Sequence, residues 1–140
     1  MKRLIVASTL LLSTTLLNAA VDSKVTYIAA DQVAKGGSLA TAPNLSITVA
    51  HRAEPGMVEV HDKETDTFYV LDGSATIVTG GTMVGGSVTA PGQHRGTDIT
   101  GGKAQRLAKG DVMVIPAGVP HWFKEVPNGV SYLLVKVNKQ

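Results

Sequence analysis

The stretch GDVMVIPAGVPHWFKE, residues Gly110 to Glu125, predicts two short strands joined by a tight reversal of the chain. A Gly-Asp turn precedes the apolar run from Val112 to Ile115, and two prolines that flank a glycine then interrupt the pattern. Proline cannot continue a central strand, and glycine supplies the positive φ that tight turns require. The reversal therefore delivers His121 to the start of the next predicted strand.

A second stretch, GMVEVHDKETDTFYVLDG from Gly56 to Gly73, alternates apolar and polar residues as a strand does. Side chains two positions apart on a strand share a face, so Glu59 and His61 project together. Asp66 follows a polar turn, and on a strand running back beside the first it returns to the same interior. Three ionisable groups so close together favour a metal site, although a solvated sheet face would also explain them.

Most of the remaining chain is predicted to form short strands separated by turn residues. They cover residues 24–29, 45–53, 57–61, 67–73, 74–81, 87–91, 97–100, 112–115, 121–126 and 130–137, with a turn at 109–111. A tight hairpin is expected at Leu71–Ser74, where Asp-Gly favours such a turn. Before these strands, Asp31 is expected to be the N-cap of one helical turn, and residues 36–44 to form a loop. Many short strands with Gly and Pro between them predict an all-β antiparallel sandwich or small barrel.

The two opening stretches resemble the two conserved motifs of the cupins. Four residues match the second motif in register: Gly110, Pro116, Gly118 and His121. Four match the first motif: Glu59, His61, Asp66 and Gly73. The resemblance covers about residues 47–137, and it implies a double-stranded β-helix, or jelly-roll barrel, with its core at about 45–137 in a domain of residues 21–140.

The resemblance also implies a set of metal ligands, namely Glu59, His61, Asp66 and His121. Cupins usually hold their metal with three His and one Glu, so Glu59 replaces a His and Asp66 replaces the Glu. Two imidazoles and two carboxylates suit Mn, Fe, Zn or Ni as a divalent ion. Because Asp66 is one methylene shorter than Glu, Glu64 is the substitute ligand if that reach fails. A polar, hydrogen-bonded interior without a metal is the alternative.

Four further titratable residues have open roles. His51 shares a strand face with Ile47, which allows either an inward or an outer position, and His94 is expected on a surface loop. Glu64 and Glu125 are candidates for proton transfer near the metal ligands.

The first 20 residues have the pattern of a secretory signal peptide. A basic start at Met1–Arg3 precedes the uncharged, mostly apolar run Leu4–Leu17, and Asn18–Ala20 then supplies small residues for cleavage. The run is shorter than the roughly 20 apolar residues of a typical membrane span, and an uncleaved anchor is the alternative. The prediction is therefore a periplasmic or secreted protein.

The net charge of the mature chain argues against nucleic acid as a partner. The sequence has 13 Lys and Arg and 11 Asp and Glu, and removal of Lys2 and Arg3 leaves 11 against 11. No basic footprint remains, and the absence of Cys excludes disulfides and thiolate chemistry.

Three classes of function are consistent with these observations. The first is an exported metal-dependent enzyme acting on a small polar organic molecule, which the resemblance extends to dioxygenases, isomerases, lyases and decarboxylases. The second is a barrel that binds a small ligand without converting it, and the third is a structural or dimerisation domain. Whether the protein is an enzyme stays open, as does a homodimer, and no membrane contact is expected after cleavage.

Overall fold

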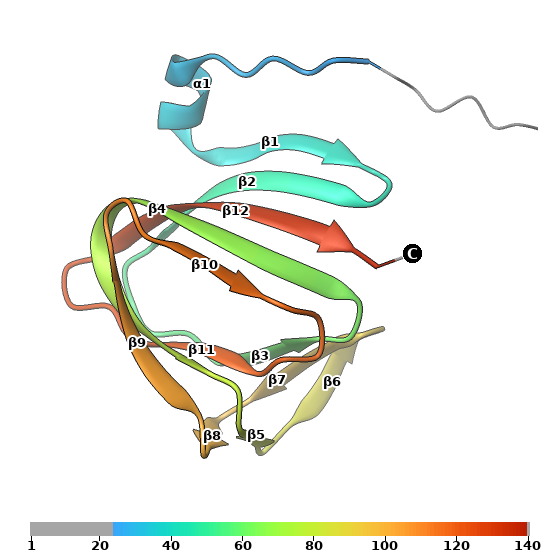
Figure 1. Cartoon of the computed structure of the whole chain (residues 1–140), viewed down its shortest axis with the longest axis vertical. Helices are drawn as coiled ribbons and strands as arrows, with labels where there is room; N and C mark the ends of the chain where they lie inside the picture. The colour runs from blue at the N-terminus through green and yellow to red at the C-terminus, as the bar shows by residue number, and fades with distance from the viewer. Residues whose placement is uncertain (1–23, 140) are drawn as a thin grey trace, which may run out of the picture.

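Two packed layers of antiparallel β-strands form the body of the protein in the computed structural model (Figure 1). The structure describes residues 24–139, so the predicted signal peptide at residues 1–20 lies outside the described residues. The layers close over one interior, which confirms the jelly-roll barrel expected from the sequence.

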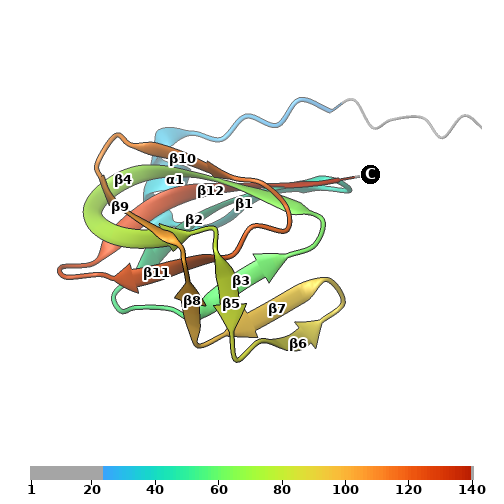
Figure 2. The same cartoon turned by 60° about the horizontal axis from the view of Figure 1, so that its bottom comes forward.

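Each layer has a simple spatial order. One layer contains, in order, β1 (Gly37–Ala42), β2 (Leu45–Arg52), β12 (Val130–Asn138), β4 (Glu64–Thr79) and β10 (Val112–Ile115). The other contains β9 (Lys103–Ala108), the second half of β4, β11 (His121–Glu125), β3 (Val58–His61), β7 (Gln93–Gly96) and β6 (Ser87–Ala90). Two short strands, β5 (Thr82–Val84) and β8 (Asp98–Thr100), pair separately beside β7 (Figure 2).

Strand β4 belongs to both layers, which makes the hairpin predicted at Leu71–Ser74 wrong. The strand runs through 16 residues, and Gly73 in its middle has a φ of +76°. Its first half pairs with β12 and β10, and its second half pairs with β9 and β11. The Asp-Gly pair therefore bends a continuous strand from one layer into the other and does not reverse it.

The N-terminal part departs from the sequence predictions in three respects. No strand forms at residues 24–29, whereas the predicted loop at 36–44 contains β1, an edge strand paired with β2. The expected helix is present as α1 (Ala30–Lys35), but its N-cap is Ala29 and Asp31 lies in the first turn. No helix among residues 24–139 is long and apolar enough to cross a membrane.

The interior is filled by apolar side chains from both layers. Its buried members are Phe68, Val70, Ala75, Ile77, Leu107, Ile115, Phe123, Val126, Val130 and Tyr132. Phe68 meets Phe123 and Tyr132 edge-on, with ring centroids 5.4 Å and 5.3 Å apart. Each such aromatic pair contributes about 0.5–1.5 kcal/mol beyond the burial of its area. This aromatic group forms the floor beneath the polar cluster, because Phe68 also packs against His121 at a centroid distance of 6.4 Å.

We expect Gly73→Ala to destabilise the fold strongly, because a Cβ on Gly73 would collide with the backbone carbonyl of Gly129 in the β11–β12 turn. The matched control is Gly110→Ala, whose φ is +91° and whose Cβ would meet no atom within 4 Å. The free energy of unfolding should fall by only about 1–2 kcal/mol in the control, which is the cost of a positive φ, and by about 3 kcal/mol or more in Gly73→Ala. Urea denaturation measures both. Equal losses would contradict the role given to this bend.

Candidate metal centre

His61 ends β3 with its ring inside the barrel, where it is 3% exposed. Its Nδ1 lies 2.5 Å from the amide oxygen of Gln93, which comes from the facing position on β7. Because an amide oxygen only accepts, Nδ1 carries a proton and donates it. Nε2 therefore faces the interior, 3.4 Å from Glu59 Oε2 and 3.5 Å from Asp66 Oδ2.

His121 begins β11 directly across from Glu59 on β3. Its Nδ1 donates to the carbonyl oxygen of Val119 at 3.0 Å, so its Nε2 also faces the interior. That Nε2 lies 3.6 Å from Asp66 Oδ2, and it is buried with no hydrogen-bond partner. A buried polar atom without a partner typically costs about 1–3 kcal/mol. A ligand that binds the Nε2 lone pair, such as a metal ion, would remove this cost.

The turn before His121 is tied to the first motif through the backbone. The amide of Gly118 donates to the carbonyl oxygen of His61 at 2.8 Å. Gly118 has a φ of +82°, a conformation that glycine adopts without steric cost. This backbone hydrogen bond and the pairing of β3 with β11 hold the two imidazole-bearing segments together, and the centroids of the His61 and His121 rings lie 5.1 Å apart.

Asp66 lies on β4 and is 2% exposed, and it faces Lys136 on the neighbouring strand β12. The Lys136 ammonium donates to both carboxylate oxygens, at 2.8 Å and 3.0 Å. Lys136 also donates to Glu64 Oε2 at 3.0 Å and lies 3.2 Å from His61 Nε2. Asp66 and Glu64 therefore both reach the cluster. The side chain of Asp66 is long enough, so Glu64 is not needed as its substitute.

The structure thus brings together all four residues that the sequence singled out as ligands. Two overlapping groups of donor atoms each lie within 4.8 Å of one another: Glu59, His61 and His121, and His61, Glu64 and Asp66. Two neutral imidazoles and carboxylates are a donor set that a divalent transition metal accepts. Imidazoles whose Nδ1–H is fixed by an oxygen acceptor are typical of metal-binding His. The cluster could therefore hold a metal ion.

The carboxylates of Asp66 and Glu59 are kept charged by their neighbours. Burial alone would raise the pKa of Asp66, but hydrogen bonds from His61 and Lys136 outweigh it, and the pKa is lowered. Burial opposes the charge of Glu59 in the same way, and His61 and the nearby Arg95 guanidinium lower the pKa of that carboxyl. Arg95 Nη2 lies 3.6 Å from Glu59 Oε1.

The two imidazoles differ in protonation. Burial alone would lower the pKa of His61, but hydrogen bonds to Asp66 and Glu59 raise it to about 9. Burial dominates at His121 and lowers the pKa of that ring. A protonated His61 donates from Nε2 to a carboxylate, whereas a neutral His61 accepts there from Lys136. Metal binding would have to displace the His61 proton.

Lys136, Arg95 and Gln93 are the members of the cluster that sequence reasoning missed. Lys136 lies four residues after the buried Tyr132 on β12 and so shares its face, which the period-two pattern of a strand predicts from the sequence. Arg95 and Gln93 face Glu59 and His61 across the β3–β7 pair. No local pattern reveals that pairing, because β7 lies in the Gly-rich stretch after β4.

Of the four titratable residues whose roles the sequence left open, three lie outside the cluster. His51 is exposed and bonds Ser131 Oγ at 3.0 Å, so its outer position is the one observed. His94 lies on a strand, not on the expected loop, and its Nε2 is 2.9 Å from Asp62 Oδ1. Glu125 is exposed at the end of β11 and is absent from both groups of donor atoms.

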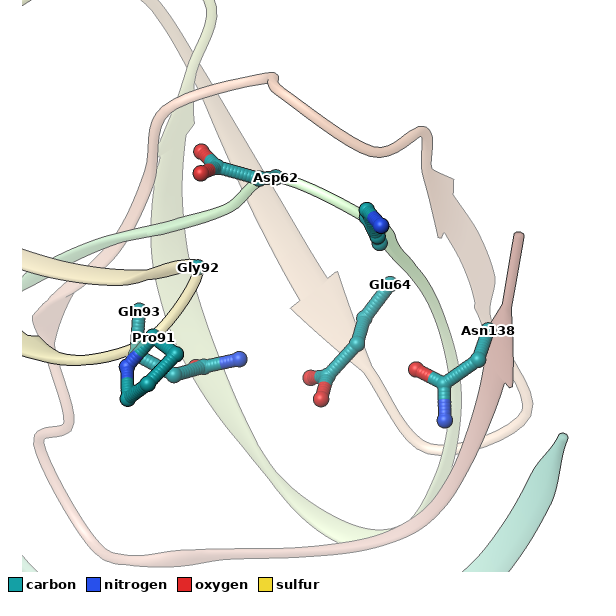
Figure 3. A pocket seen from close by; sticks show the side chains of 7 residues that line it. Asp62, Glu64, Pro91, Gly92, Gln93 and Asn138 are labelled. Atoms are coloured by element: carbon teal, nitrogen blue, oxygen red, sulfur yellow. The ribbon is translucent and has the colours of Figure 1, made fainter. Parts of the chain in front are cut away.

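A cavity of about 340 Å³ adjoins the cluster (Figure 3). Its lining residues are Asp62, Lys63, Glu64, Pro91, Gly92, Gln93 and Asn138. Glu64 and Gln93 belong to both places, because Glu64 bonds Lys136 and Gln93 bonds His61. A small molecule in this cavity would meet the edge of the cluster.

Comparison with known proteins agrees with the fold and the motifs. Residues 41–140 match the family described as Cupin. The chain belongs to the cupin family. No curated protein matches the chain.

Solved structures show the same fold at low identity. KdgF from Halomonas sp. is 16% identical with a TM-score of 0.54, over 75% of this chain and 80% of KdgF. TT1209 from Thermus thermophilus is also 16% identical with a TM-score of 0.54, over 75% of this chain and 83% of TT1209. The cupin domain of Schizosaccharomyces pombe Cnp3 is 15% identical with a TM-score of 0.55, over 74% of this chain and 64% of that one. At these identities the likeness shows the cupin fold alone.

We expect Gly118→Val to lower both the stability of this cupin and its affinity for Zn²⁺. A β-branched residue at this φ costs on the order of 1–3 kcal/mol, and the turn that places His121 would shift. The matched control is Gly101→Val, because Gly101 has a φ of +73° and also has no atom within 4 Å of a built Cβ. Thermal melts with and without Zn²⁺ should show destabilisation in both variants and a reduced Zn²⁺ response only in Gly118→Val. A normal Zn²⁺ response in Gly118→Val would mean that the turn does not position His121.

Proposed function

We propose that this cupin is an exported protein that binds one divalent transition metal ion and acts on a small polar organic molecule. The proposed ligands are Glu59, His61, Asp66 and His121, and the proposed metals are Mn, Fe, Zn and Ni. The observation that carries the proposal is His121 Nε2, which is buried, unpaired and turned toward two carboxylates. An apolar or merely structural interior would gain nothing from such an atom.

The charges of the ligand set support a divalent ion. Glu59 and Asp66 bring two negative charges, and neutral His61 and His121 bring none, so a doubly charged cation would balance the four ligands. The Gln93 side-chain oxygen and the Val119 carbonyl accept hydrogen bonds from the two Nδ1–H groups, which fixes both rings with Nε2 inward before any metal binds. Little reorganisation of the imidazoles would then accompany binding.

The neighbouring cavity suggests which molecules would be acted on. A bound divalent ion would supply Lewis acidity toward a carbonyl or carboxylate oxygen. Gln93 and Asn138 line the cavity with amide groups that donate to or accept from hydroxyl and carbonyl groups of a ligand. Glu64 lies between the cavity and Lys136 and is placed to accept a proton from a ligand at its carboxylate. Cupins bind small ligands, and a hydroxylated carbonyl compound fits these groups.

The alternative function is a small-ligand-binding barrel without a functional metal. One observation favours it: the Lys136 ammonium already bonds Asp66 and Glu64 and lies 3.2 Å from His61 Nε2. In that case the polar cluster would be a self-contained ion-pair network at the edge of a ligand cavity. The amount of metal in the purified protein separates the two functions.

Export is proposed from residues 1–20, which carry the secretory pattern, and it places the mature domain at residues 21–140 in the periplasm or outside the cell. Mass spectrometry of the protein recovered from those compartments tests the proposal, because cleavage would leave a chain that lacks residues 1–20.

Purified untagged protein should contain about one equivalent of a transition metal, and Glu59→Ala and His121→Ala should each bind it at least about 100-fold more weakly. The control is His51→Ala, which removes an exposed imidazole outside the cluster. Elemental analysis and calorimetric titration measure content and affinity. A wild-type protein without metal, with a melting temperature that ignores added Mn, Fe, Zn and Ni, would leave the ligand-binding alternative.

The response to metal should depend on pH. The pKa of His61 is raised to about 9, so its protonated form stabilises the metal-free fold fully below its ordinary pKa of about 6.5. That contribution is lost as the pH rises through about 9. Because a metal needs the neutral ring, the rise in melting temperature caused by Mn²⁺ should be larger at about pH 8 than at about pH 6. A response that stays flat between about pH 8 and pH 4.5 would contradict ligation by His.

A further inference from the structure

Lys136 fills a place in the cluster where a cation is expected. Its ammonium touches three side chains, with distances of 2.8 Å and 3.0 Å to the oxygens of Asp66, 3.0 Å to Glu64 Oε2 and 3.2 Å to His61 Nε2. These three residues are also one of the two groups of donor atoms that could hold a metal ion. A positive charge of the chain itself therefore occupies that group.

The other group of donor atoms comes from Glu59, His61 and His121. Within residues 24–139, Lys136 contacts this group only at His61. The two groups share His61, whose inward-facing Nε2 has a single lone pair. In the neutral ring, that lone pair either accepts a hydrogen bond from Lys136 or binds a metal, so the two uses exclude each other. Lys136 also holds both oxygens of Asp66, the fourth proposed ligand.

We propose that Lys136 is a built-in cation that stabilises the cluster without metal and weakens metal binding at the adjoining Glu59, His61 and His121. This inference rests on the proposed metal site. The ammonium pairs with the carboxylates of Asp66 and Glu64 and, together with His61, compensates their charge at the wall of the barrel. The same charge repels a second cation nearby, and Lys136 must release His61 before the imidazole can become a ligand.

The decisive variant is Lys136→Met, which keeps most of the unbranched side chain and removes its charge. Without metal, it should melt well below the wild type, because Asp66 loses its charged partner while it stays buried. Its affinity for Zn²⁺ and Mn²⁺, measured by calorimetry, should rise by about tenfold or more, because the competing cation is gone. The rise in melting temperature on adding Zn²⁺ should exceed that of the wild type.

The matched control is Lys109→Met, which makes the same change at an exposed turn and should leave both measurements at wild-type values. Equal or weaker metal affinity in Lys136→Met, with normal binding by the wild type, would overturn the role of Lys136 and leave the metal site standing. If neither protein bound metal, the metal site itself would fail, and this inference would fail with it.

A measurement on the wild-type protein covers the case in which Lys136→Met does not fold. Lysine acetylation with a water-soluble ester, followed by peptide mass spectrometry, should find Lys136 slow to react without metal and faster with bound Zn²⁺, relative to the exposed Lys109. If calorimetry shows that Zn²⁺ binds while the acetylation rate of Lys136 stays unchanged, the ammonium does not leave its partners and the proposal is wrong.

Discussion

The barrel depends on one strand that is shared by its two layers. Strand β4 pairs along its first half with β12 and β10 and along its second half with β9 and β11. This continuity fixes the separation of the layers near Gly73, where the bend leaves no room for a Cβ beside the β11–β12 turn. Asp66 comes from the first half of β4, and His121 pairs with Thr79 at the end of the second half. The distance between these two candidate ligands is therefore a consequence of how β4 bends.

Local spacing together with the resemblance to the two cupin motifs predicted the four residues that converge. The rule that alternate residues share a strand face placed Glu59 with His61, and the Pro-Gly reversal placed His121 at the start of a strand. Both inferences concern geometry over a few residues, which local sequence controls. The hairpin at Leu71–Ser74 failed because Asp-Gly permits a reversal but does not require one. Pairing with four neighbouring strands keeps β4 continuous through the bend at Gly73 and outweighs the local preference.

The residues that surround the ligands could not be predicted in the same way. Gln93 and Arg95 reach the cluster because β7 pairs with β3 in a register that links positions more than 30 residues apart. The short strands of that region carry little hydrophobic alternation, and their place in the layer is set by long-range pairing. Lys136 is an intermediate case, because its parity on β12 was readable but its partner Asp66 follows only from the β4–β12 register.

The polar cluster obeys a constraint that is independent of its function. Asp66 is almost fully buried, and a buried carboxylate is costly unless a positive charge or several donors compensate it. In the metal-free barrel, Lys136 and the protonated His61 supply that compensation. A divalent ion would supply it as well, but only by taking the His61 lone pair for itself. Since the proposed metal would need the same imidazole nitrogen, it would compete with the proton and with Lys136 for that nitrogen, and the balance between them would set how tightly this cupin binds metal.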